Sequence, residues 1–171
     1  MGRFKHLVDS LALIEIFKDK YHIPQEVSLQ YCSLKGLAFD REVGEVIIPM
    51  IAFIEGGMTL PMGRITKYYL HNHKLCSQQC APNFFRILGA VDALDQHLEL
   101  RLTWHDVVHL YEGHKQKGAE YYLKYRSDFI RLSSCLPKSN KGMKDDYLIV
   151  SDPWHDGHPY PTQLGKPGRV P

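Results

Sequence analysis

A run of apolar residues at helical spacing is the feature that most constrains how this chain folds. Between residues 82 and 98, apolar side chains recur at intervals of three and four positions, which is the period of one face of an α-helix. Pro82 falls in the first turn, where a proline is well tolerated. The members of the stripe are Phe84, Phe85, Ile87, Leu88, Val91, Leu94 and Leu98. The segment therefore predicts a helix whose apolar face belongs to the core.

Weaker signals of the same kind predict four further helices. They cover residues 4–17, 46–55, 63–71 and 103–114. The first ends before Pro24, because the residue preceding a proline is displaced from the α region. The second begins with Val46, Ile47 and Ile48, a run that equally fits a strand. Residues 24–45 show no sustained period and are predicted to connect these elements through short turns.

The character of the chain changes after the last predicted helix. Three short segments, at residues 121–123, 129–132 and 147–150, are aromatic or β-branched and bounded by turn residues, which predicts strands. Residues 151–171 hold five of the ten prolines and three of the thirteen glycines, and predict an extended or disordered tail. The expected class is α+β and predominantly α-helical, with about five short helices, a few short antiparallel strands and this tail.

Composition excludes several classes of protein. The 171 residues are 44% hydrophobic and 23% charged, as in globular domains, and a net charge of +2 indicates no strong attraction to nucleic acid or membrane. The most apolar run, from Val46 to Ile54, is too short to span a bilayer. Four scattered cysteines do not form a disulfide framework. We expect a soluble intracellular protein, whether nuclear or cytoplasmic.

The segment His105-Asp106-Val107-Val108-His109 imitates a zinc-protease helix. Two histidines four residues apart lie on one helix face and bind zinc in that class, with an intervening glutamate as general base. Asp106 is one methylene shorter than that glutamate. The alternative is structural: Thr103 is a good N-cap, and Asp106 resembles the acidic member of a capping box. The structural interpretation is favoured, and a metal-dependent hydrolase using His105, Asp106 and His109 stays as the alternative.

Two other groups of residues suggest binding chemistry. His71, His73, Cys76 and Cys80 offer zinc ligands, but all four lie within ten residues, unlike the paired spacing of common zinc fingers. Buried, reduced thiols are the favoured interpretation, and no cofactor is predicted.

The second group is basic and follows a tyrosine-rich segment. It comprises Arg126, Arg131, Lys138, Lys141 and Lys144. With the tyrosines at 121, 122 and 125 it has the cations and stacking rings of a nucleic-acid contact surface. Asp145 and Asp146 dilute this charge, so that a solvated loop is the alternative.

Several motifs follow one another from about Val46 to the end of the chain. They are Ile48-Pro49, Phe53-Ile54-Glu55-Gly56-Gly57-Met58-Thr59-Leu60-Pro61, Cys80-Ala81-Pro82-Asn83-Phe84-Phe85-Arg86-Ile87-Leu88, Tyr121-Tyr122-Leu123 and Lys144-Asp145-Asp146-Tyr147-Leu148-Ile149-Val150. In this order they resemble the gypsy-type transposon domain of plant retroelement-derived proteins. That family shows an acidic-Gly-hydrophobic-Pro step, a Pro-Asn helix start, a tyrosine-rich strand and a final Lys-Asp-aromatic strand.

The resemblance divides the chain and suggests a role. It covers the chain from about Val46 and implies a transposon-like domain at 46–150 and a tail at 151–171 that looks truncated. The N-terminal amphipathic helix and connecting region at 1–45 stay outside it. The resemblance implies origin in a mobile element, and either a structural role or contacts with nucleic acid or other retroelement proteins. It implies no catalytic residues, no association with a membrane and no small-molecule substrate. A degenerate fragment without selected function is a further alternative.

Overall fold

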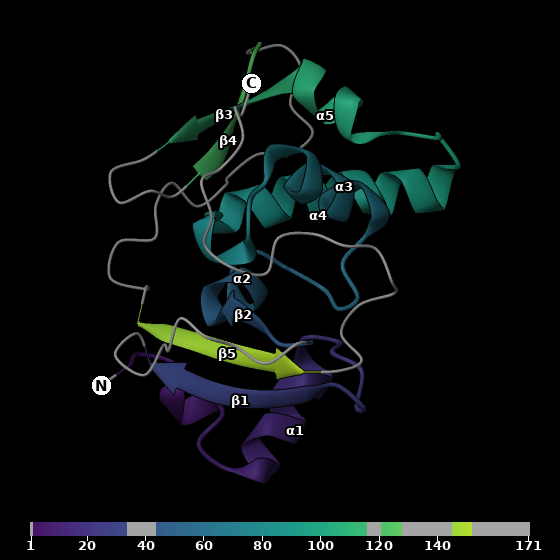
Figure 1. The fold of residues 1–171 in the computed structure, drawn as a ribbon. Helices are drawn as coiled ribbons and strands as arrows, with labels where there is room; N and C mark the ends of the chain where they lie inside the picture. Colours follow the sequence, from purple (N-terminus) through teal and green to yellow (C-terminus); the bar gives the residue numbers. More distant parts are fainter. Residues whose placement is uncertain (1, 34–43, 116–120, 128–144, 152–171) are drawn as a thin grey trace.

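The chain forms an α+β fold in a computed structural model, which confirms the predicted class. The structure describes residues 2–33, 44–115, 121–127 and 145–151 (Figure 1). Its α-helices are α1 (Leu11–Lys20), α2 (Met50–Ile54), α3 (Arg64–His73), α4 (Pro82–Leu98) and α5 (Trp104–Leu110). Short 3₁₀ helices are η1 (Lys5–Leu7) and η3 (Ser77–Gln79). The strands are β1 (Ser28–Ser33), β2 (Val46–Pro49), β3 (Tyr111–Lys115), β4 (Tyr121–Tyr125) and β5 (Asp146–Ser151). None of the described helices combines the length and apolarity needed to cross a bilayer.

The larger sheet has three antiparallel strands in the order β1-β5-β2, with β5 in the centre. Leu29 of β1 and Val46 of β2 both pair with Val150 of β5. Residues 146–150 are all buried, as expected for a strand that has neighbours on both edges and is covered on its faces. The predicted strand at 147–150 is therefore confirmed, and the predicted strand at 129–132 lies outside the described residues.

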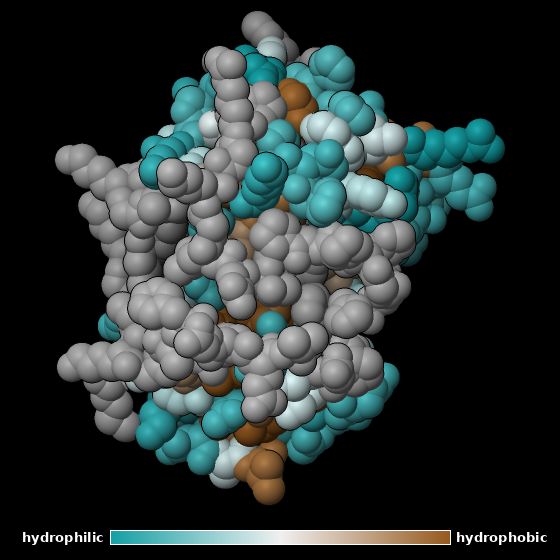
Figure 2. Space-filling model, viewed as in Figure 1, coloured by the Kyte–Doolittle hydropathy of each residue, from teal (hydrophilic) through white to brown (hydrophobic). Residues whose placement is uncertain are grey.

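Two predictions for the N-terminal region are wrong. Residues 24–45, predicted as turns, contain β1, which pairs along its whole length with β5. The helix predicted over 4–17 is divided into η1 and α1, because the Ser10 side chain accepts a hydrogen bond from the Leu13 N–H and caps a new helix. Leu11, which lies within the predicted helix, is 83% exposed. Hydrophobic residues reach the surface at this end of the molecule in Figure 2.

Asp146 joins the N-terminal segment to the sheet. Its buried carboxylate accepts hydrogen bonds from the Phe4 N–H, at 2.9 Å, and from the Tyr31 hydroxyl, at 2.8 Å. Burial, followed by this hydrogen bond, raises the pKa of Tyr31 to about 12. Residues 2–33 are thus held to β5 by side-chain as well as backbone hydrogen bonds.

The remaining helices largely follow the predictions. Residues 46–55 combine both interpretations, since β2 runs directly into α2 at Met50. Helices α3 and α4 lie where 63–71 and 82–98 predicted them, and they pack together. The helix predicted over 103–114 instead ends at Leu110, because Tyr111 is buried and begins a hairpin with β4. The strand predicted at 121–123 is confirmed as part of β4.

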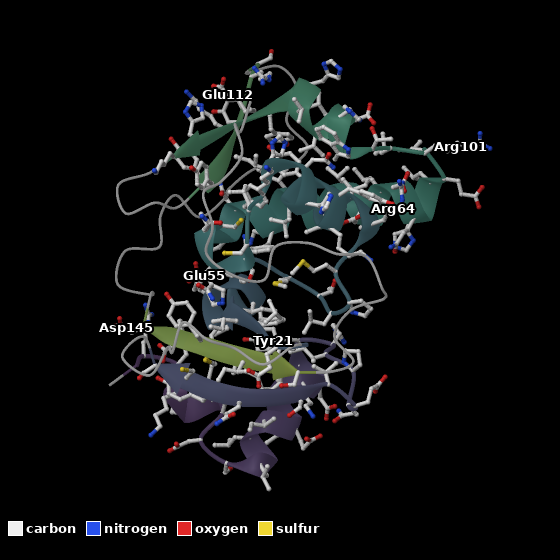
Figure 3. The ribbon with its side chains drawn as sticks, viewed as in Figure 1. Tyr21, Glu55, Arg64, Arg101, Glu112 and Asp145 are labelled. Carbon is white, nitrogen blue, oxygen red and sulfur yellow. The ribbon has the colours of Figure 1, made fainter. Side chains whose placement is uncertain are left out.

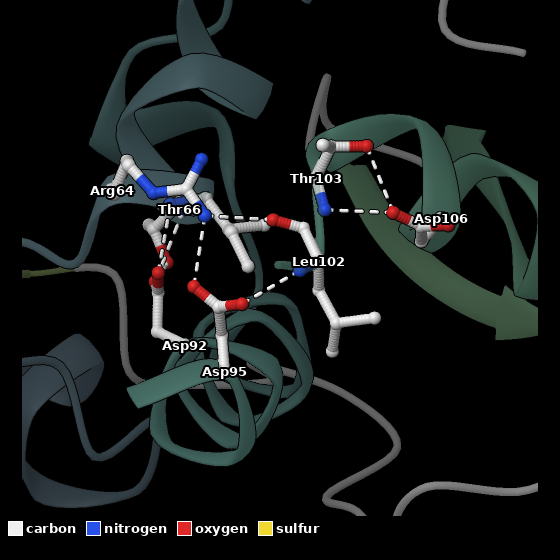
Figure 4. A network of polar contacts seen from close by, with 8 residues as sticks. Arg64, Thr66, Asp92, Asp95, Leu102, Thr103 and Asp106 are labelled. Atoms are coloured by element: carbon white, nitrogen blue, oxygen red, sulfur yellow. Dashed lines mark hydrogen bonds and ion pairs between the residues drawn. The ribbon is translucent and has the colours of Figure 1, made fainter. Parts of the chain in front are cut away.

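A carboxylate from α4 caps the start of α3 (Figure 4). Asp92 is buried and accepts hydrogen bonds from the Ile65 N–H, the Thr66 N–H and the Thr66 hydroxyl, at 2.6 to 3.1 Å. The N-cap residue, Gly63, has no side chain for this task, and a Cβ there would clash with the Asp92 carboxylate. The free N–H groups at the start of α3 are therefore satisfied across the helix pair.

We predict that Asp92→Asn lowers the free energy of unfolding by about 2 kcal/mol, since it removes charge-assisted bonds to buried donors. The measurement is urea denaturation followed by circular dichroism. Glu26→Gln is the control, because Glu26 is exposed and the same carboxylate-to-amide change there costs little. Equal midpoints for the two variants would contradict the assigned cap.

Candidate functional site

The start of α5 is a capping box, as the sequence predicted. Asp106 Oδ2 accepts hydrogen bonds from the Thr103 N–H, at 2.7 Å, and from the Thr103 hydroxyl, at 2.8 Å (Figure 4). These two bonds hold the pKa of Asp106 below its usual range. The carboxylate is therefore directed toward the helix start.

The two histidines of the same segment lie on the surface of α5. Both His105 and His109 are exposed, and the His105 ring stacks on Trp104 with 3.7 Å between ring centroids. Within the described part of the chain, no group of three or more His, Cys, Asp and Glu side chains is placed to hold a metal ion. The geometry around α5 is therefore that of a capped helix with two exposed histidines.

The other possible ligands are divided between surface and core. His71 is exposed, whereas His73 is buried between the rings of Tyr69 and Trp104. Cys76 and Cys80 are buried thiols. Burial raises the pKa of Cys76 to about 11.

The hairpin of β3 and β4 presents a different chemistry. Its strands pair Glu112 with Lys124 and His114 with Tyr122, and side chains two residues apart share one face of a strand. The same alternation carries Arg126, just past β4, onto this side. We define the outer face of the hairpin as Glu112, His114, Tyr122, Lys124 and Arg126. All five are exposed or partly exposed, while Tyr121 and Leu123 alternate with them and are buried.

Contacts within the outer face hold its side chains in place. The rings of His114 and Tyr122 stack at 25°, with centroids 5.5 Å apart. His114 Nε2 lies 2.7 Å from Glu112 Oε1, and Arg126 Nη1 lies 3.7 Å from Glu112 Oε2. The hydrogen bond from His114 is the main cause that lowers the pKa of Glu112. Glu112, labelled in Figure 3, thus connects an aromatic pair to a guanidinium.

Arg126 is also tied to the protein backbone. Its Nε donates to the Val108 carbonyl oxygen, at 2.8 Å, and its N–H donates to the Leu110 carbonyl oxygen, at 2.9 Å. Its side chain is nevertheless 40% exposed. The guanidinium is therefore oriented by α5 and by Glu112 while facing solvent.

The structure describes one of the five residues that are predicted to contact nucleic acid. Arg126 belongs to the outer face, while the other four lie outside the described residues, namely Arg131, Lys138, Lys141 and Lys144. Sequence reasoning missed His114 and Lys124. The alternation of residues 111–115 is a signal for a strand that would carry His114, but those residues also fit the end of a helix.

No protein-family model, curated protein or solved structure matches this chain. The resemblance to the gypsy-type transposon domain therefore stays a prediction.

We predict that Asp106→Asn lowers the free energy of unfolding by about 1 kcal/mol at neutral pH, because it weakens the capping box. Since the pKa of Asp106 is lowered in the folded state, its contribution is present above the unfolded pKa and is lost as pH falls through the folded pKa. The destabilisation should therefore shrink in acid, as measured by denaturant midpoints at neutral and acidic pH.

Glu26→Gln is the matched control for this measurement, because it makes the same carboxylate-to-amide change at an exposed residue outside α5. It is expected to leave the midpoint nearly unchanged at neutral pH. A destabilisation by Asp106→Asn that stays constant down to strongly acidic pH would contradict the role of the Asp106 charge.

Proposed function

We propose that this chain is a non-enzymatic domain of retroelement origin that binds single-stranded nucleic acid through the outer face of the hairpin. The observation that carries the proposal is the stacked pair of His114 and Tyr122 beside two cations, Lys124 and Arg126. The order of motifs from Val46 to Val150 supports the retroelement origin.

The chemistry of the outer face suits an unpaired strand. Aromatic rings bind the faces of unstacked bases, and basic side chains beside them contact the phosphates. Bases in a duplex are already stacked, so an exposed ring gains less there. Glu112 offsets part of the positive charge, which predicts modest affinity with strong dependence on salt.

The position of the hairpin also supports this role. The edge of β4 that faces away from β3 is fixed to the start of α4, since the Asn83 side-chain amide donates to the Leu123 carbonyl oxygen and the Ala81 N–H donates to the Tyr121 carbonyl oxygen. The hairpin lies at the end of the molecule opposite the three-stranded sheet (Figure 1). Its outer side chains are thus presented from a rigid base, which limits the entropy lost on binding.

The role of α5 in this proposal is to support the hairpin. Asp106, the acid between the two histidines, is engaged with Thr103. The last turn of α5 supplies the Val108 and Leu110 carbonyl oxygens that orient Arg126. The zinc-protease-like segment then serves as a scaffold and performs no hydrolysis.

We predict that Tyr122→Ala weakens binding of a fluorescent single-stranded oligonucleotide about tenfold, because one base loses its stacking partner. Tyr122→Phe keeps the ring and should bind nearly as well as the wild type. The measurement is fluorescence anisotropy at low ionic strength. Tyr68→Ala, which removes a partly exposed tyrosine from α3, is the control.

A salt titration separates the cations from the ring. Lys124→Gln with Arg126→Gln should reduce the slope of log K against log salt by about 1.4, since two phosphate contacts are lost. Lys20→Gln, an exposed cation on α1, should leave the slope unchanged. Absence of binding by the wild-type chain at low salt, or equal losses in the control, would refute the proposal.

A further inference from the structure

A second surface feature lies between α4 and the segment that follows α2. Residues 56–63 pass along one side of α4 and leave a trough with a volume of about 480 Å³. Glycines, two methionines and small α4 residues contribute to its lining, and Arg86 and Asp92 are the charged members. The volume falls in the range of small-ligand sites.

The middle of the α4 side of the trough is made of very small residues. Gly89, Ala90 and Ala93 line it in the middle of the helix. Packing does not require glycine at position 89, because a Cβ added there would meet no atom within 4 Å. A glycine inside a helix costs about 0.5–1 kcal/mol relative to alanine. The visible consequence of Gly89 is the additional room in the trough.

The opposite side is formed by the turn after α2. Gly57 has φ +63°, a left-handed conformation that favours glycine, and a Cβ at this position too would meet no atom within 4 Å. Met58 and Met62 are buried beneath this side. Between the two glycines the trough is therefore open, and the two methionines add apolar surface to its lining.

One end of the trough carries a cation. Arg86 is exposed, and its Nε donates to the carbonyl oxygen of Glu55, a residue labelled in Figure 3. In the part of the chain that the structure describes, Arg86 makes no ion pair with a carboxylate. Its terminal nitrogens are therefore available for a carboxylate ligand, which a guanidinium binds through two parallel hydrogen bonds.

The one acidic residue in the lining, Asp92, lies away from the end of the trough where Arg86 would bind a carboxylate. Asp92 is buried, and its oxygens accept hydrogen bonds from the backbone and side chain of Thr66 and from the Ile65 N–H. On α4 it lies six positions beyond Arg86, or about 9 Å along the helix axis. The positive and negative ends of the trough are thus separated.

We propose that this trough binds a small carboxylate with an apolar or aromatic body. The carboxylate pairs with Arg86, and the body lies over Gly89, Ala90 and Ala93 against the turn at Gly57. This site is distinct from the outer face of the hairpin, and its function does not depend on nucleic-acid binding.

The test compares phenylacetate with phenylacetamide, which has the same shape and no charge. Amide chemical shifts of the full chain are followed by NMR during titration with each compound. Phenylacetate is expected to shift the amides of Gly57, Gly89 and Ala93 and to bind about fivefold more tightly than the amide. Arg86→Gln should remove that difference, while the control Arg101→Gln, at an exposed arginine outside the trough, should retain it.

A second variant tests the space rather than the charge. Gly89→Leu fills the trough and replaces glycine with a better helix former, so the fold is kept. It should abolish binding of both compounds, whereas His97→Leu, an exposed α4 position outside the lining, should not. Equal binding of acid and amide to the wild type, shifts confined to other residues, or no binding up to the solubility limit of phenylacetate would overturn the proposal.

Discussion

The pairing of β5 with both β1 and β2 is the interaction on which the rest of the structure depends. It joins the distant strand at residues 146–151 to two strands from the first third of the chain, so that residues 28–33 and 46–49 flank it on either edge. Such long-range pairing closes large loops, whose entropy must be repaid by burial. The apolar side chains of Leu148 and Val150, both fully buried, supply part of that stabilisation.

Helix α4 performs the corresponding task in the other half of the molecule. Asp92 caps α3, while Asp95, one turn further on, accepts hydrogen bonds from the Arg64 guanidinium and the Leu102 N–H (Figure 4). Asn83 in the first turn holds β4. One helix therefore aligns α3, the segment that leads into α5, and the hairpin, so that both proposed binding surfaces share a single rigid support.

The sequence predicts elements well where local signals and burial agree. The stripe that begins at Pro82 gives α4 its correct bounds, and Thr103 with Asp106 correctly marks the start of α5. Strand β1 was not predicted, because its residues show no clear alternation and its conformation depends on β5, more than a hundred residues away. Residues 111–114 were predicted as helical because Tyr111 also continues the apolar period of α5.

The candidate site could be predicted only in part for the same reason. The charge of Arg126 is enough to identify it, but His114 and Lys124 become candidate site residues only through the hairpin register, which pairs them with Tyr122 and Glu112. That register also gives the two faces of the hairpin different roles. Buried Leu123 contributes to the core, whereas its outward-facing neighbours contribute little to stability and are available for recognition. A change on the outer face therefore alters binding chemistry while the hairpin keeps its place on α4.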